Sequence, residues 1–110
     1  MIPELQAPDP KIFVSYAHED RARAQAVIHV LEKAGCHIWW DGLIVAGAAF
    51  ATTTEQALEA ASAVVVLWSR AASVSHWVRD EATRGRDRGC LVPISLDGSE
   101  PPLGFRHFPP

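Results

Sequence analysis

A glutamate and a tryptophan stand at a spacing that would place a carboxylate beside an aromatic ring. Glu81 follows Trp77 by four residues, so in a helix both side chains lie on one face. The start of such a helix also presents backbone N–H groups suited to a phosphate. By residue type alone, a helical glutamate near Arg84 is usually a solvated surface residue, and a tryptophan is as often a core anchor. Catalytic and structural interpretations of the pair both stay open on these residues alone.

Polar residues also follow two of the apolar runs in the chain. Ser15 and Tyr16 stand at the end of the first run, and Ser69 comes directly after the third. If these runs are parallel strands, ligands bind outside their carboxyl ends. We therefore expect the three residues to lie around one rim of the sheet, together with the loop 41–49, and to be candidate ligand contacts.

The elements that must position these residues alternate along the chain. Short apolar runs rich in β-branched and aromatic residues predict strands at 11–15, 36–40, 63–68 and 91–95. Helical spacing and capping signals predict helices from 21 to a stop at Gly35, from 50 to 61 and from 76 to 88, with Asp20 and Ser75 as N-caps. Strands that alternate with helices form right-handed βαβ units. The predicted fold is α/β, a flavodoxin-like parallel sheet with helices on both faces.

Composition narrows the class of protein further. The 110 residues suit one domain, and the formal net charge is −3. This charge argues against a nucleic-acid groove and against an anionic membrane surface, because both need clustered Lys and Arg. The longest apolar stretch, 63–68, is too short to span a bilayer. Cys36 and Cys90 each open an apolar run and are expected to be buried free thiols, which fits a reducing, cytoplasmic location.

Several common catalytic patterns are absent from the sequence. It contains neither a glycine-rich dinucleotide or P-loop motif nor a G-x-S-x-G nucleophile elbow. The five histidines lack zinc spacing and there is no C-x-x-C, so we expect no metal site. A phosphate-accepting receiver domain shares the predicted topology, but its third strand would need an aspartate where this chain has Leu67-Trp68-Ser69. That alternative is disfavoured.

Three segments, taken in order, resemble the Toll/interleukin-1 receptor (TIR) family in its bacterial form. They are IFVSYAHED at 12–20, GCHIWWD at 35–41 and WVRDE at 77–81, the last preceded by a serine-rich stretch. The family carries an F-[IV]-S-Y-[SA]-H-x-D box, a G-x-x-[VI]-W-W-D strand end and a W-x-x-x-E motif. On this resemblance we predict a TIR-like domain at 11–105, a Pro-rich leader at 1–10 and an irregular tail at 106–110.

The resemblance implies an enzyme that cleaves NAD+ at the nicotinamide–ribose bond and releases nicotinamide and linear or cyclic ADP-ribose. It implies Glu81 as the catalytic carboxylate, which would stabilise the positive charge of an oxocarbenium-like transition state. NAD+ is then the substrate, and no cofactor is expected. The predicted substrate-binding residues are Trp77, Ser15, Tyr16, Ser69 and Gly47, the last in the loop that usually covers the pocket in this family.

A non-catalytic scaffold that recruits other TIR domains is the alternative function. Family members commonly have a proline before the glycine of the loop at 41–49, where this chain has Ala46-Gly47, so loop-mediated assembly stays open. The family usually continues into a fifth strand and a final helix, and we expect both to be missing here and the sequence to be part of a longer protein. The expected partners are NAD+, other TIR domains and fused domains, in a setting such as antiphage defence.

Overall fold

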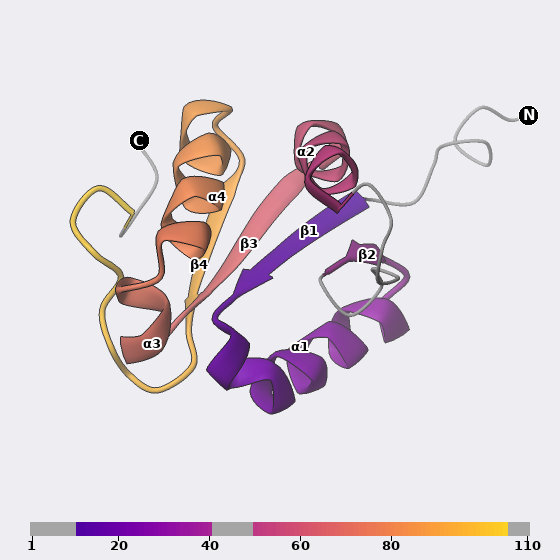
Figure 1. Cartoon of the computed structure of the whole chain (residues 1–110). Coiled ribbons are helices and arrows are strands. Elements are labelled where there is room, and N and C mark those ends of the chain that lie inside the picture. The colour runs from indigo at the N-terminus through magenta and orange to yellow at the C-terminus, as the bar shows by residue number, and fades with distance from the viewer. Residues whose placement is uncertain (1–10, 41–49, 106–110) are drawn as a thin grey trace, which may run out of the picture.

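The computed structural model describes residues 11–40 and 50–105, except for the side chains of 50–53. Strands and helices alternate along the chain (Figure 1). In chain order they are β1 (Lys11–Tyr16), the 3₁₀ helix η2 (His18–Asp20), α1 (Arg21–Lys33), β2 (His37–Trp39), α2 (Phe50–Ala60), β3 (Ala63–Trp68), α3 (Arg70–Ser73), α4 (His76–Asp87) and β4 (Leu91–Ser95). The predicted leader, the loop 41–49 and the tail 106–110 lie outside the described residues, so the predicted domain limits stay predictions.

The four described strands form one parallel sheet in the order β2-β1-β3-β4. The alternation of strands and helices therefore produces the flavodoxin-like α/β fold predicted from the sequence. Because β2 lies on one side of β1 and β3 on the other, the chain changes direction across the sheet between β1 and β3. The carboxyl ends of these two strands form the switch point at which ligands bind in such sheets.

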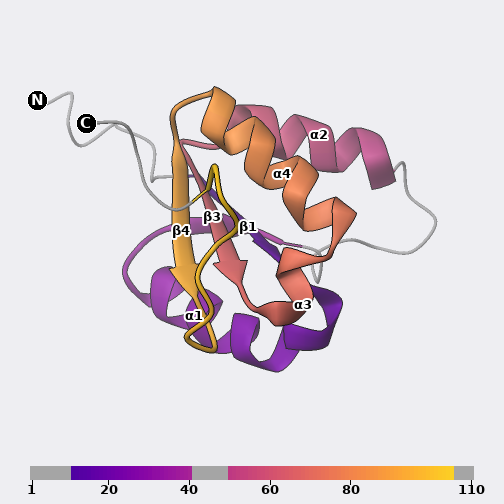
Figure 2. The same ribbon diagram turned by 90° about the vertical axis from the view of Figure 1, so that its left-hand side faces the viewer.

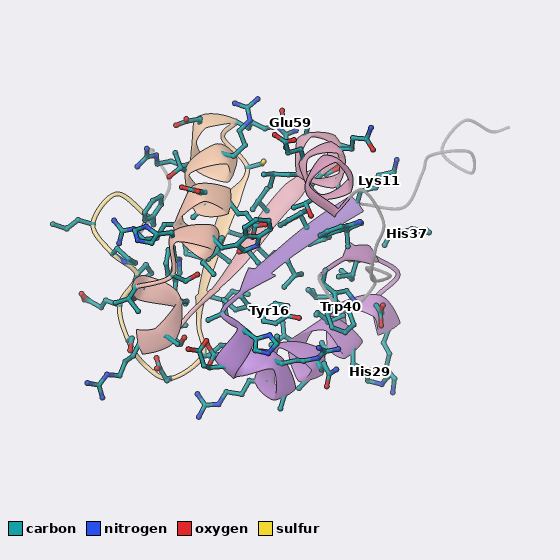
Figure 3. All side chains as sticks on the ribbon, in the orientation of Figure 1. Lys11, Tyr16, His29, His37, Trp40 and Glu59 are labelled. Carbon is teal, nitrogen blue, oxygen red and sulfur yellow. The ribbon has the colours of Figure 1, made fainter. Side chains whose placement is uncertain are left out.

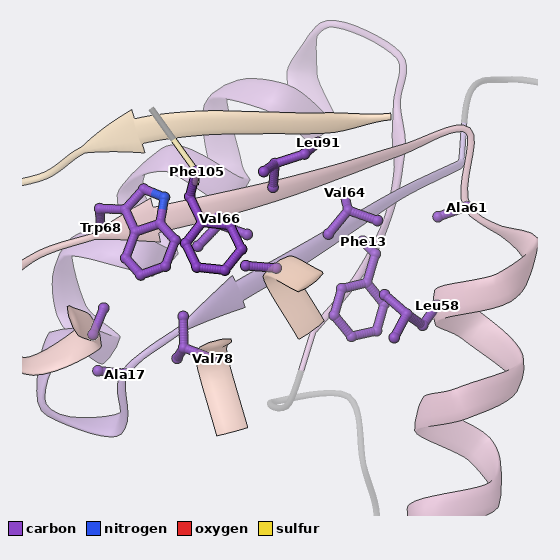
Figure 4. Packing of buried hydrophobic residues seen from close by; sticks show 12 residues of the cluster. Phe13, Ala17, Leu58, Ala61, Val64, Val66, Trp68, Val78, Leu91 and Phe105 are labelled. Atoms are coloured by element: carbon purple, nitrogen blue, oxygen red, sulfur yellow. The ribbon is translucent and has the colours of Figure 1, made fainter. Parts of the chain in front are cut away.

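Helices cover both faces of the sheet (Figure 2). α2 and α4 lie side by side over one face, and α1 lies on the other. The core on the α2/α4 side gathers around the fully buried Trp68 and takes in Phe13 and Val78 (Figure 4). The core on the α1 side includes Val14, Tyr16 and Ile28. Both clusters are mostly aliphatic, as expected of strands buried on two faces.

Alternation along the strands sends neighbouring aromatic side chains to opposite faces. Trp39 stacks on Phe13 of the α2/α4 core with ring centroids 5.1 Å apart. Trp40 turns to the α1 side, where its ring lies 6.4 Å from that of Tyr16 (Figure 3). The two tryptophans therefore pack against different faces of the sheet, as the alternation of side chains along a strand requires.

α4 approaches the sheet most closely at Gly85. A Cβ atom at this position would lie 2.8 Å from Cβ of Val64 in β3, a distance that side-chain carbons do not tolerate. Glycine costs helix stability by its backbone freedom, but here it lets the helix axis come down onto the strand. This contact fixes the distance between β3 and the helix that carries Trp77 and Glu81.

Local details differ from the sequence predictions. Asp20 is the N-cap residue of α1 as predicted, but its side chain makes no capping bond, and its carboxylate accepts a hydrogen bond from the hydroxyl of Ser69 instead. The serine-rich stretch after β3 contains the short helix α3, for which the sequence shows no periodic signal because one helical turn is too short. Cys36 and Cys90 are free thiols but only partly buried. By contrast, Ser75 caps α4 as predicted and accepts a hydrogen bond from Val78 N–H at 3.2 Å.

The edge strand β4 carries Pro93 at a position that suits an edge. Cys90 C=O and Leu96 N–H bond to β3, and in a parallel pair alternate residues face the same neighbour, so Pro93 faces away from β3. A proline there removes an outward donor and hinders the addition of another strand. After β4 the chain turns back beside the sheet (Figure 2), and Phe105 packs on Trp68 with ring centroids 5.4 Å apart.

Candidate functional site

A pocket of about 680 Å³ lies between α2 and α4. Its volume is in the range of small-molecule sites. α2 contributes one turn and a half and α4 contributes two turns, so the pocket runs along both helices. The lining residues are Thr54, Glu55, Leu58 and Glu59 from α2 and Trp77, Asp80, Glu81 and Arg84 from α4.

Glu81 lies at the buried side of this pocket. Only 5% of its surface is exposed, which is rare for a glutamate and costly for a charged one. Its place follows from helix periodicity, because Val78 and Ala82 of the same helix are fully buried against β3. The interpretation of Glu81 as a solvated surface residue is therefore wrong, and the residue lines a space that a ligand can enter.

Trp77 lines the same pocket one helical turn before Glu81. It is 41% exposed, so it is not the core anchor that its residue type allowed. A large aromatic ring exposed at the wall of a pocket offers a surface on which a flat ring can stack. The structure thus brings together the two residues that the W-x-x-x-E spacing paired.

An ion pair joins α2 and α4 at one end of the pocket. Arg84 donates two hydrogen bonds to the carboxylate of Glu59, one from Nε and one from Nη2 to Oε1 at 2.6 Å. The hydrogen bond from Arg84 lowers the pKa of Glu59, and the same contact raises the pKa of Arg84 above its ordinary value. Figure 3 shows Glu59 on α2, away from the α1 side where Tyr16 lies.

The remaining charges that line the pocket are negative. Arg84 is the one cation among the described lining residues, and Glu59 already neutralises it. Glu55, Asp80 and Glu81 are the other charged residues that line it. An acidic wall beside an aromatic ring favours a ligand group that is flat and positively charged.

Thr54 was not singled out by sequence reasoning, although it stands in this pocket. It is 4% exposed, and its hydroxyl has no hydrogen-bond partner among the described residues. The available signal was the spacing of Thr54, Leu58 and Ala61 along one face of α2, since Leu58 and Ala61 belong to the core. A threonine in that series has to point toward the sheet and α4.

Ser69 lies at the carboxyl end of β3, where it was predicted, but its hydroxyl is used within the fold. It donates to the carboxylate of Asp20 and accepts from Ala72 N–H at 3.0 Å, which caps α3. The residue is 2% exposed and does not line the α2/α4 pocket. Its assignment as a substrate contact stays a prediction.

The other predicted contacts separate from one another. Ser15 is buried on β1, and strand alternation directs its side chain to the same face as Phe13, beneath α4. Tyr16 belongs to the core on the α1 side, away from the pocket. Neither of them lines the pocket, and Gly47 lies outside the described residues. The structure brings Trp77 and Glu81 together and leaves the substrate contacts at these three positions as predictions.

No group of three or more His, Cys, Asp or Glu residues within the described part of the chain is arranged to hold a metal ion. No helix within it has both the length and the apolar character needed to cross a bilayer.

Comparison with known proteins adds one match. The model of a family described as "TIR domain" matches residues 12–109, which is most of the chain. No curated protein matches the sequence significantly.

Proposed function

Because the chain belongs to the TIR domain family, we propose that it cleaves NAD+ at the nicotinamide–ribose bond, with Glu81 as the catalytic carboxylate. The observation that carries this proposal is the burial of Glu81 in a pocket beside Trp77. TIR domains include both NAD+-cleaving enzymes and signalling scaffolds. A buried glutamate that lines a pocket of ligand size favours the enzyme, since a scaffold has no need of one.

The charge of the pocket fits the bond that would break. The nicotinamide ring of NAD+ is a cation, so it leaves C1′ of the ribose as a neutral base and takes the electron pair of the C1′–N1 bond with it. The ribose becomes oxocarbenium-like, and a carboxylate stabilises that positive charge. Water then adds to C1′ and loses a proton to solvent, which gives nicotinamide, ADP-ribose and H+. Addition of a nucleophile from within the ADP-ribose itself gives a cyclic product in place of the linear one.

Trp77 would hold the ring that leaves. Its exposed indole lies one helical turn from Glu81, and the acidic neighbours Glu55 and Asp80 increase the attraction for a cation. The adenosine phosphates would have to lie outside this acidic wall, because Arg84 is already paired with Glu59. We propose a reducing, cytoplasmic location, where NAD+ is available, and the two free thiols fit it.

The scaffold alternative has support of its own. Val74, 78% exposed, and Trp77 lie three residues apart at the junction of α3 and α4, and together they present an apolar surface. Such a surface fits an interaction with another TIR domain. Assembly and catalysis are compatible, so the two functions differ only in whether NAD+ is consumed.

The test is release of nicotinamide from NAD+ by the purified chain, measured by chromatography. The protein concentration is varied over a range that spans the onset of self-association. We expect nicotinamide and an ADP-ribose product to appear together in equal amounts. Self-association without any loss of NAD+ would contradict the enzyme and leave the scaffold.

A further inference from the structure

Thr54 lines the pocket and carries a buried hydroxyl that has no hydrogen-bond partner among the described residues. Burial of a hydroxyl that makes no hydrogen bond destabilises a folded protein. A threonine in a helix commonly avoids this by bonding to the carbonyl four residues earlier. Thr54 Oγ1 makes no such bond, and it is 4% exposed. The position therefore carries an unfavourable polar group for which the fold gives no reason.

The surroundings of Thr54 indicate what would satisfy it. Thr54 lines the pocket from α2, and Glu81 lines it from α4. A ligand that reaches Glu81 through this pocket passes a hydroxyl able both to donate and to accept one hydrogen bond. Sugar hydroxyls have the same dual capacity, so a ribose that lies between the two helices can bond to the threonine and the carboxylate at once.

From this we propose that Thr54 is a ligand-contacting residue whose hydroxyl hydrogen-bonds a ribose hydroxyl in the α2/α4 pocket. The identity of the ligand as an ADP-ribose derivative rests on the function proposed above. The contact itself rests on the burial and position of the hydroxyl. Without ligand the hydroxyl has no partner among the residues that the structure describes, and in the complex it gains one.

This role predicts opposite effects on stability and on binding. Thr54→Val removes the hydroxyl and keeps the shape and the β-branch, so helix propensity hardly changes. The ligand-free variant should unfold at the same temperature as the wild type or at a higher one. Its affinity for ADP-ribose should fall about five- to tenfold, the effect of one lost hydrogen bond. Thr54→Ser keeps the hydroxyl and should keep the affinity.

Thr83 supplies the matched control. It lies on α4 outside the pocket, and its hydroxyl donates to the carbonyl of Arg79 at 2.8 Å. Thr83→Val is the same chemical change at a hydroxyl that already has a partner. It should leave the affinity for ADP-ribose unchanged and should not raise the unfolding temperature.

The experiment is calorimetric titration of ADP-ribose into the wild type and these three variants, with thermal unfolding of each ligand-free protein. Weaker binding by Thr54→Val alone, without loss of stability, is the expected result. Wild-type affinity in Thr54→Val, a lower unfolding temperature in that variant, or no binding of ADP-ribose by the wild type would each overturn the proposal. ADP-ribose binding does not require turnover, so a chain that binds through Thr54 and leaves NAD+ intact would refute the glycohydrolase and retain this contact.

Discussion

The α2/α4 pocket and the carboxyl-end rim of the sheet use their polar residues in different ways. At the rim, Ser69 and Asp20 bond to each other, and Asp97 accepts N–H bonds from Arg70 and Ser99. In the pocket, Glu81 and the Thr54 hydroxyl are buried at the wall of a space large enough for a ligand. Asp20, Ser69 and Asp97 hold loops and a short helix in place at the rim, whereas Thr54 and Glu81 line a volume that the described side chains leave empty.

Position at a strand end is therefore not enough to identify a ligand site in this fold. The four described parallel strands end at this rim, and the connections that leave them need caps for their backbone groups. Short polar residues provide these caps, so serines gather there whether or not a ligand binds. Burial of a carboxylate is costly, so a buried glutamate that lines a pocket is the more specific sign of function.

The largest expected effect on stability follows from removal of the rim hydroxyl of Ser69. Ser69→Ala loses the cap of α3 and leaves the carboxylate of Asp20 without this donor. We expect a loss of about 2–3 kcal/mol in the free energy of unfolding, measured by urea denaturation. Unchanged stability would mean that the hydroxyl is available for a ligand, as the sequence predicted. The rim and the α2/α4 pocket would then not differ in how they use their polar groups.

A smaller loss is expected where α4 meets the sheet. Gly85→Ala gains up to about 1 kcal/mol of helix propensity, but its Cβ would overlap Val64 and push the helix that carries Glu81 away from β3. Overpacking of this kind typically costs about 1–3 kcal/mol. We expect a net loss of about 1–2 kcal/mol by the same denaturation measurement. A stabilised variant would show that the contact at Gly85 does not set the distance between α4 and β3.

The smallest effect concerns the pH dependence of the rim. Bonds from Ser99 and from the backbone N–H of Arg70 lower the pKa of Asp97 from 3.8 to about 2. A carboxyl whose folded pKa is depressed contributes stability above its unfolded pKa and loses it as the pH falls. The stability difference between the wild type and Asp97→Ala should therefore be constant above about pH 5 and shrink from about pH 4 to about pH 2. Urea denaturation at each pH measures it, and a difference that grows on acidification would contradict the assignment.

Most of the fold could be predicted from the sequence, because its signals are local. The apolar runs became β1 to β4, and Ser75 caps α4 as its position before Trp77 indicated. Asp20 also stands directly before a helix, yet it bonds to Ser69, 49 residues further along the chain. A contact over that distance in sequence depends on the packing of β3 beside β1, and no pattern near Asp20 could indicate it.

The candidate site was predictable in part for the same reason. Trp77 and Glu81 lie on one helix face, so their spacing predicted that they lie together. Thr54 comes from another helix, and only the packing of α2 beside α4 makes it a neighbour of Glu81 in the pocket. Burial of Glu81 likewise depends on how α4 rests on β3, and residue type alone favoured the wrong answer.

The proposed cleavage of NAD+ depends on the buried carboxylate of Glu81. The direct measurement compares the rate of nicotinamide release by the wild type, Glu81→Gln and Glu32→Gln, each first shown to be folded and to self-associate alike. Glu32 is an exposed glutamate of α1, on the other side of the sheet, so its variant controls for the same chemical change. We predict that Glu81→Gln loses at least about 100-fold in kcat and that Glu32→Gln keeps the wild-type rate. Equal rates in all three proteins would contradict the catalytic role of Glu81.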